Sequence, residues 1–225
     1  MATTKNITMK QFNGTDYDTL YPKTVYNQVS GVAPAGYGLG AKDGKLITDG
    51  NDALVGGWFY WGNIDTNLPF TYGHMRVDPR ISSTNGQTLM QTAYSDSYQG
   101  SVAQRKMIDG VWKPWEWVNP PMQLGVEYRT TERYQGKPVY VKLVDLGNCP
   151  SSSYKDVTVL GNTEVGFRCE GTWTYGGGST LPFESSSNDK MAIAIIDKKV
   201  RIFTGGKDFS TYTAKATIYY TKTTD

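Results

Sequence analysis

The last segment of the chain, residues 212–220, alternates strictly between apolar and polar side chains. One side would carry only apolar or aromatic residues: Tyr212, Ala214, Ala216, Ile218 and Tyr220. Because successive side chains of a strand point to opposite faces, this period of two predicts a strand with one buried and one solvent-facing side. We therefore expect the chain to end in a sheet that buries this face against a second layer.

Two further segments near the C-terminus predict β-hairpins. Residues 127–134 and 139–146 are strand-like and flank a Gln-Gly-Lys-Pro turn, and residues 191–196 and 200–203 flank an Asp-Lys-Lys turn. Short turn-forming segments between strand-like runs are typical of hairpins. We therefore expect residues 122–225 to form an antiparallel β-sandwich. Since residues 191–196 are apolar on both faces, one of those faces is available to a neighbouring subunit.

The middle of the chain, residues 31–121, predicts a smaller β-rich domain. Residues 88–94 and 102–108 are strand-like and flank a polar turn, and the double proline Pro120-Pro121 would end a sheet there. The four consecutive aromatic residues Trp58–Trp61 must point to both faces of a strand, so we expect two of them to be exposed or to pack between subunits. Residues 1–30 are polar and predict an extended leader that orders on a partner.

Composition supports a mostly β chain and excludes several functions. The 225 residues include 25 glycines, 16 tyrosines and 6 tryptophans, and only 20% are charged, a balance typical of strands and turns. The 23 basic and 21 acidic residues form no block of like charge, so we expect no nucleic-acid partner. No apolar run is long enough to insert into a membrane. The polar N-terminus lacks the apolar core of a signal peptide, so we expect synthesis in the cytoplasm.

Candidates for catalysis are sparse. His74 is the only histidine, and the sequence offers no nucleophile elbow beside which it could act in a triad. Asp43, Asp49 and Asp52 lie in a Gly- and Asn-rich stretch, where turn formation explains them better than paired acid catalysis or calcium binding. We therefore expect no enzyme activity, no cofactor and no metal.

The two cysteines, Cys149 and Cys169, are too few for a structural zinc site. In a protein made in the cytoplasm they are expected to be packed, unreactive thiols. A disulfide formed after the producing cell lyses is the alternative.

A stretch from about residue 35 to residue 118 resembles the pyocin-knob domain of phage and pyocin tail fibres. The residues that carry the resemblance are Gly36-Tyr37, Gln104-Arg105 and the closing segment Gly110–Trp115, with its two tryptophans three residues apart. The resemblance implies that Trp112, Trp115 and Arg105 belong to the core of the knob. The alternative is that Trp112, Trp115 and Trp117 form a platform for sugar.

Two other stretches resemble tail proteins from prophages of Gram-positive bacteria. They are Lys5–Asp18 with Leu20-Tyr21-Pro22, and Gly125–Tyr128 followed by Tyr134–Lys142. The resemblance implies an intertwined homotrimer whose N-terminus attaches to other tail or baseplate proteins. The residues we expect to make this attachment are Phe12, Tyr17, Leu20, Tyr21 and Val25.

The distal domain offers a candidate ligand site in the Gly-rich segment 168–178 and the neighbouring loop 185–189. Aromatic rings stack on the apolar faces of sugars, while Arg, Asn and Asp provide directional hydrogen bonds. The candidate glycan-binding residues are Arg168, Trp173, Tyr175, Asn188 and Asp189. An ordinary hairpin with one core tryptophan explains the segment equally well.

These observations predict a mostly β receptor-binding tail fibre, located in a virion tail or a phage-tail-like particle. Its distal domain would bind cell-wall polysaccharide or teichoic acid of the host, with three copies adding avidity. The first alternative is a purely architectural spike, collar or adaptor that binds only other tail proteins. The second alternative is a glycan depolymerase, but the sequence shows no pair of acidic residues that could be assigned to its catalytic site.

Overall fold

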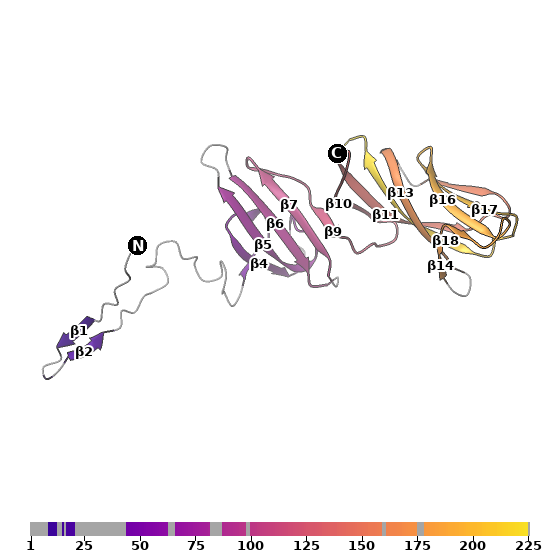
Figure 1. Ribbon diagram of the computed structural model, residues 1–225. Coiled ribbons are helices and arrows are strands. Elements are labelled where there is room, and N and C mark those ends of the chain that lie inside the picture. The colour runs from indigo at the N-terminus through magenta and orange to yellow at the C-terminus, as the bar shows by residue number, and fades with distance from the viewer. Residues whose placement is uncertain are drawn as a thin grey trace, which may run out of the picture.

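The protein is almost entirely β, as predicted, and its architecture is shown by a computed structural model (Figure 1). The residues that the structure describes are 9–12, 15, 17–20, 44–62, 66–81, 87–97, 100–158, 161–174 and 178–224. Within these ranges the helical content is one short 3-10 turn, Gly50–Asp52. No helix in the described part of the chain is long and apolar enough to cross a membrane.

The N-terminal leader contains a hairpin, which the sequence analysis did not predict. Strands β1 (Met9–Phe12) and β2 (Tyr17–Leu20) pair antiparallel, and Phe12 lies opposite Tyr17. The hairpin places three of the five expected attachment residues on paired strands. The other two, Tyr21 and Val25, lie outside the described residues.

A large sheet of twelve strands extends through both the middle and the C-terminal parts of the chain. Its strands are β3 (Lys45–Leu46), β4 (Gly57–Gly62), β5 (Tyr72–Ile81), β6 (Gln87–Ser95), β7 (Val102–Ile108), β8 (Val111–Trp112), β9 (Glu116–Asn119), β10 (Glu127–Tyr134), β11 (Lys137–Asn148), β13 (Thr163–Thr174), β14 (Gly178–Leu181) and β18 (Thr213–Lys222). From one edge to the other the order is β14-β13-β18-β11-β10-β9-β7-β6-β5-β4-β3, with β8 paired to β7.

The C-terminal part forms the predicted β-sandwich. A second sheet, in the order β12 (Tyr154–Thr158), β17 (Lys199–Thr204), β16 (Lys190–Ile196) and β15 (Phe183–Glu184), packs on strands β13 and β14 of the large sheet. The core between the layers includes the buried side of β18, where Ala214, Ala216, Ile218 and Tyr220 are at most 3% exposed. The alternation in the sequence therefore arises from packing against this second layer.

The predicted hairpins are confirmed: β6 pairs with β7, β10 with β11, and β16 with β17. The last two have turns with the backbone geometry of the tight two-residue type, whereas a longer loop joins β6 to β7. Gln135 and Gly136 have φ angles of 50° and 80°, and Asp197 and Lys198 have 49° and 62°. Two successive positive φ angles match the right-handed twist of the flanking strands. A third such turn, Asp109-Gly110, joins β7 to β8.

The strand β16 is covered on one side only within a single chain. Met191 is buried, and Ile193 and Ile195 pack against the core of the sandwich. The residues between them, Ala192 and Ala194, are half-buried on the outer face. The outer face of β16 would therefore have to be covered by something other than the described residues of this chain.

A separate core lies under the N-terminal half of the large sheet. It consists of the inward residues of β4 to β7, such as Phe59, Trp61 and Met75, covered by Ile47, Ala53 and Phe70 from the preceding loops. Of the four consecutive aromatics, Phe59 and Trp61 are therefore buried in the chain's own core. Trp58 is half-buried and Tyr60 is 44% exposed on the opposite face, in agreement with the alternation of a strand.

The two cores lie on opposite faces of the same continuous sheet. Glu116 and Trp117 are neighbours in β9 and therefore point to opposite sides. Trp117 packs against the N-terminal core, whereas Glu116 contacts Arg129, whose strand partner Tyr140 belongs to the core of the sandwich. The face of the sheet that is open over β4 to β7 thus continues into the face that is covered in the C-terminal half.

The junction between the halves lies at β9 and β10. These strands run parallel and are joined through one residue pair, Thr130 and Trp117. The Trp117 ring also meets Tyr128 edge to face at 5.1 Å. Pro120 and Pro121 lie between the two strands, so the predicted boundary at residue 121 falls where the cores meet and the sheet continues. The division into domains at that residue stays a prediction.

Candidate functional site

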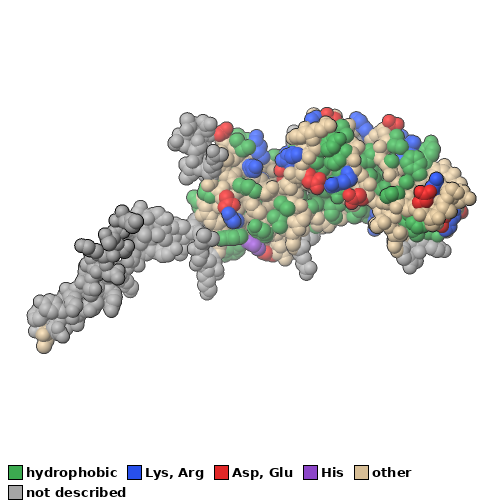
Figure 2. Space-filling view, viewed as in Figure 1, with side chains coloured by type: hydrophobic (Ala, Val, Ile, Leu, Met, Phe, Trp, Pro, Cys, Tyr) green, Lys and Arg blue, Asp and Glu red, His purple; other side chains and the backbone are tan. Residues whose placement is uncertain are grey.

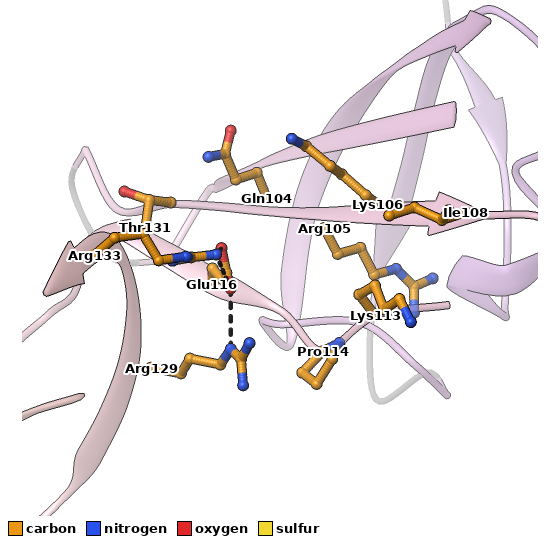
Figure 3. A pocket seen from close by; sticks show the side chains of 10 residues that line it. All are labelled: Gln104, Arg105, Lys106, Ile108, Lys113, Pro114, Glu116, Arg129, Thr131 and Arg133. Atoms are coloured by element: carbon orange, nitrogen blue, oxygen red, sulfur yellow. Dashed lines mark hydrogen bonds and ion pairs between the residues drawn. The ribbon is translucent and has the colours of Figure 1, made fainter. Parts of the chain in front are cut away.

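A basic groove opens at this junction, between β7, β9 and β10 (Figure 3). Its volume is about 450 Å³. The charged residues that line it, which together define the basic groove, are Arg105, Lys106, Lys113, Arg129, Arg133 and Glu116. Figure 2 shows basic side chains, with acidic ones between them, over the middle of the molecule.

The strand β7 and its tight turn bring the two lysines of the groove together. Because β7 alternates, Lys106 is exposed while its neighbours Arg105 and Met107 are buried. The Asp109-Gly110 turn then folds the chain back alongside β7, and the Lys113 amide donates a hydrogen bond of 2.8 Å to the Lys106 carbonyl. The backbones of the two lysines are therefore adjacent, and both residues line the groove.

Glu116 holds the two arginines of β10 at the other side. Its Oε1 accepts hydrogen bonds from Arg129 Nε at 3.0 Å and from Arg133 Nη2 at 2.7 Å, and its Oε2 lies 2.8 Å from the same Arg133 nitrogen. The Glu116 and Arg129 side chains are each 16% exposed. Arg129 also donates to the Tyr140 hydroxyl at 3.3 Å. Charge-assisted contacts of this kind orient the guanidinium groups.

The groove carries a surplus of positive charge. Four cationic side chains, Lys106, Lys113, Arg129 and Arg133, face one carboxylate, which leaves a formal charge of +3. Arg105 is not counted, because it is 5% exposed on the opposite face of β7 and lies near Asp49. Lys106 and Lys113 make no ion pair with any described residue. A concave surface lined by one sign of charge concentrates ligands of the opposite sign. The arrangement is therefore suited to phosphate or carboxylate groups. Lysine binds such groups as a point charge, and arginine binds them through two parallel N–H donors of its planar guanidinium.

Arg105 forms the inner wall of the groove and connects it to the N-terminal core. Its guanidinium carbon lies 3.9 Å from the centre of the Trp112 ring and 4.6 Å from that of Trp115. Its Nε donates to Gln91 Oε1 at 2.8 Å, and the Gln91 amide donates in turn to the carbonyls of Gly50 at 2.7 Å and Ala53 at 3.0 Å. Arg105 thus contacts both of the other expected knob-core residues, Trp112 and Trp115.

Burial lowers the pKa of Arg105 to about 10, and the nearby Asp49 carboxylate opposes this shift. A pKa of about 10 still leaves the guanidinium charged at neutral pH. Gly50 permits the close approach of the loop, because a Cβ atom there would lie 2.9 Å from Arg105 Nη2 and 2.5 Å from the Asn67 carbonyl oxygen. The inner wall therefore depends on a glycine at this position.

The expected glycan residues of β13 do not form one site. Arg168 and Trp173 are five residues apart in the same strand and therefore point to opposite faces. Trp173 packs into the core of the sandwich beside Phe183 and Tyr212, with ring centres 5.4 and 5.2 Å away. Its position matches the alternative that we described, an ordinary hairpin with a core tryptophan.

Arg168 lies on the outer face, with its guanidinium 3.5 Å from the centre of the Tyr219 ring. Its charge is offset by Glu132, at 3.2 Å, and by Glu170, at 3.7 Å. An arginine between two carboxylates has little attraction left for an anionic ligand.

The loop residues Asn188 and Asp189 hold their own turn together. Asp189 accepts hydrogen bonds from the Ser185 hydroxyl at 2.8 Å and from Lys207 Nζ at 3.3 Å, and the Asn188 carbonyl accepts one from the Lys207 amide at 3.0 Å. These contacts lower the pKa of Asp189. The fifth expected residue, Tyr175, lies outside the described part of the chain.

The remaining candidates for catalysis or metal binding are Asp43, Asp49, Asp52 and His74. Asp49 accepts the Asn51 amide at 2.7 Å and so caps the 3-10 turn that follows it. His74 is exposed and lies 3.1 Å from an Asp96 oxygen. Asp43 lies outside the described residues. Among those described, no group of three His, Cys, Asp or Glu side chains is arranged to hold a metal ion.

Both cysteines are free thiols. Cys149 is buried and Cys169 half-buried in the sandwich core. Burial raises the pKa of Cys149, and burial together with the adjacent Glu170 carboxylate raises that of Cys169 to about 12.

The sequence analysis missed the basic groove because its cations come from three separate segments. Net charge and runs of like charge do not show such a cluster, which forms when β10 is placed beside β9 and β7. One signal was available: the alternation of β7 already places Gln104 and Lys106 on one face and Arg105 on the other.

The fold and the groove define a class: a nearly all-β protein with two cores on opposite faces of one sheet and an anion-attracting groove where they meet. Comparisons with known proteins add little to this. No known family profile matches the chain, and no curated protein matches it.

Several solved structures of pyocin tail fibres are similar to the chain at low levels. An N-truncated R2-type pyocin tail fibre is 12% identical with a TM-score of 0.28, over 81% of this chain and 99% of the fibre. A C-terminal fragment of the R1 pyocin fibre of P. aeruginosa is 12% identical with a TM-score of 0.26, over 77% of this chain and 66% of that fragment. A C-terminal fragment of the R2 fibre of that organism is 10% identical with a TM-score of 0.28, over 90% of this chain and 70% of that fragment. Similarity this low does not by itself assign a fold or a function.

Proposed function

We propose that the chain is a non-enzymatic, cell-surface-binding protein of a phage tail or phage-tail-like particle, and that its basic groove takes the anionic groups of a host wall polymer such as teichoic acid. The observation that carries this proposal is the surplus of three positive charges around a cavity of about 450 Å³. The tail context rests on the sequence resemblance of residues 35–118 and of the N-terminal segment.

The groove is a better ligand site than the distal loops that the sequence suggested. Arg168 is offset by two carboxylates and Trp173 lies in the core, whereas Lys106 and Lys113 are exposed and lack acidic partners among the described residues. The position of the ligand site thus moves from the C-terminal sandwich to the junction between the two cores.

The chemistry of the groove favours binding over catalysis. Glu116 is its one carboxylate, and both of its oxygens accept hydrogen bonds from arginine. A general acid needs a transferable proton, and a general base needs an accessible lone pair. Glu116 instead acts as a brace for Arg129 and Arg133.

The proposal includes a homotrimer attached to the tail through residues 1–30. A single groove that binds repeated anionic groups would be weak and salt-sensitive, and three copies on one particle would raise the overall affinity through effective concentration. We expect deletion of residues 1–30 to abolish incorporation into particles and to leave binding to purified polymer unchanged.

The test is the affinity of the full chain for purified poly(glycerol phosphate) teichoic acid at low and high salt. The double variant Lys106→Gln/Lys113→Gln should bind about tenfold more weakly, since each exposed ionic contact contributes on the order of 0.5–1 kcal/mol. The matched control is Lys190→Gln/Lys215→Gln, which removes two exposed lysines of the sandwich.

An equal loss in both double variants would show attraction by overall charge and would contradict a site in the groove. No binding at any salt concentration would favour the alternative, an architectural spike, collar or adaptor. The half-exposed outer face of β16 is the structural feature that suits that alternative.

A further inference from the structure

The open face of the N-terminal sheet carries a cluster of aromatic rings that the groove does not include. These residues, named here the aromatic face, are Trp58 and Tyr60 of β4, His74 of β5 and Tyr94 of β6. The strand register places Tyr60, His74 and Tyr94 in one row across three strands. Directly paired residues point to the same side of a sheet, so the four rings share one face.

The rings form a contiguous surface. The His74 and Tyr94 rings are stacked, with centres 5.3 Å apart and planes at 15°. The Trp58 ring lies 5.9 Å from His74 and 6.1 Å from Tyr94. Tyr60 is 44% exposed at the end of the row. This surface is not needed for the N-terminal core, which uses Phe59 and Trp61 on the other side of the same strand.

Polar groups surround these rings. Asp96 contacts His74 Nδ1 at 3.1 Å, and Arg76 Nε donates to Asp78 at 2.8 Å on the same face. The Trp58 ring is tilted by 44° to His74 and by 36° to Tyr94, so the rings form an uneven aromatic patch. Such a patch with charged and hydroxyl-bearing neighbours suits a ligand with an apolar ring face and a polar edge. Pyranose sugars have this chemistry.

The aromatic face continues into the basic groove. Trp58, Arg76, Thr92, Gln104 and Glu116 form one row of paired residues that crosses β4, β5, β6, β7 and β9. Gln104 and Glu116 line the groove. With strands about 4.8 Å apart, Trp58 lies roughly 14 Å from Gln104 along this row, a distance that a short oligomeric ligand spans.

We propose that the aromatic face is a sugar-stacking subsite and that, together with the basic groove, it selects a phosphodiester polymer carrying pyranose substituents over the same polymer without sugar. This inference rests on the proposed function, because the groove supplies the contacts to phosphate. The stacked rings add affinity only for the glycosylated form.

The test compares two purified polymers, poly(glycerol phosphate) with and without N-acetylglucosamine substituents, on the full chain. The glycosylated polymer should bind about fivefold to tenfold more tightly, and Tyr60→Ala should remove this difference. Tyr60 is suitable because it is 44% exposed, so its substitution by alanine should leave the fold intact. The control, Tyr154→Ala, removes a tyrosine of the sandwich that is 56% exposed and should preserve the difference.

The outcomes separate the two proposals. Equal binding of both polymers, unaffected by Tyr60→Ala, would overturn the sugar subsite and leave the proposed function standing. Binding of neither polymer would overturn both. A preference for the glycosylated polymer that survives Tyr60→Ala and is lost in Tyr154→Ala would also overturn the inference, since it would place the sugar on the sandwich.

Discussion

At the scale of single residues, Arg105 has the largest structural role in the N-terminal half. It is 5% exposed, stacks between Trp112 and Trp115, and links through Gln91 to the loop at Gly50 and Ala53. A buried cation is costly unless ring faces and hydrogen bonds replace water around it. The planar guanidinium makes both kinds of contact at once, which an ammonium group does not.

We therefore expect Arg105→Lys to destabilise the protein by about 2 kcal/mol, through loss of the stacking and of the hydrogen bond to Gln91. Urea unfolding followed by tryptophan fluorescence measures the change. The control Arg76→Lys alters an exposed arginine paired to Asp78 and should change stability by less than about 0.5 kcal/mol. Similar effects of the two substitutions would contradict the role assigned to Arg105.

The thiol of Cys169 should be unreactive in the folded protein. Its pKa is raised from 9.0 to about 12 by burial and by Glu170, and the thiolate is the reactive form. Three pKa units correspond to about a thousandfold less thiolate at pH 8. We expect alkylation by iodoacetamide, followed by mass spectrometry, to be slower by about that factor in the native chain than in urea. Equal rates would contradict the burial.

At the scale of elements, the hairpin turns set the register of the strands that build the groove and the sandwich. Asp109-Gly110 and Gln135-Gly136 place glycine at the second positive φ angle, where a side chain is disfavoured. The turn between β16 and β17 has Lys198 at the corresponding position, with φ of 62°. This turn is therefore less favourable than the other two by the cost of a left-handed residue with a Cβ atom.

Lys198→Gly should stabilise the protein by about 1 kcal/mol, because glycine adopts the left-handed conformation without strain. The urea midpoint should rise while the slope of the transition stays the same. As a matched substitution in the opposite direction, Gly136→Ala, at φ of 80°, should destabilise by a similar amount. An unchanged or lowered midpoint for Lys198→Gly would show that the lysine makes compensating contacts.

At the scale of the whole molecule, the position of the two cores explains why the groove exists. Each half packs one face of the shared sheet against its own core, and the face that carries the core changes at β9 and β10. Figure 1 shows the two halves as successive parts of the molecule. Arg129 and Arg133 of β10, Lys106 of β7 and Lys113 belong to neither core. Their side chains can therefore line a cavity and remain partly exposed.

The C-terminal half should lose stability in acid. The pKa values of Asp156, Asp189 and Asp208 are lowered from 3.8, chiefly by hydrogen bonds from Arg201, Ser185 and the Ser210 backbone amide respectively. A lowered carboxyl pKa contributes stability that is fully present above the unfolded-state value and is lost as the pH falls through the folded-state value. Thermal unfolding between pH 7 and pH 2 should show this loss below about pH 4.

Asp156→Asn should make that decline shallower, because one of the three carboxylates no longer takes up a proton on unfolding. The variant should also be less stable than the parent chain at pH 7, where the pair with Arg201 is intact. An identical pH dependence in parent and variant would show that Asp156 does not contribute to acid sensitivity.

Much of the strand content follows from local sequence. The alternation of β18 and the turn residues between β10 and β11 predict their elements because side-chain direction and turn geometry depend on neighbours within a few residues. The burial of Phe59 and Trp61 and the exposure of Tyr60 likewise follow from strand periodicity, although the periodicity does not say which pair is buried.

Only the tertiary structure decided where ligand-binding chemistry can gather. Trp173 and Arg168 are close in sequence, yet they point to opposite sides of β13, and one is in the core while the other is paired with acids. Glu116 and Arg133 are distant in sequence and meet because β10 lies beside β9. The amino-acid sequence by itself determined the strands with clear alternation, such as β18 and the hairpin of β10 and β11, since these depend on local periodicity and turn residues. The sites depend on which strands become neighbours and which face is covered, and those relations arise from packing between residues far apart in the chain.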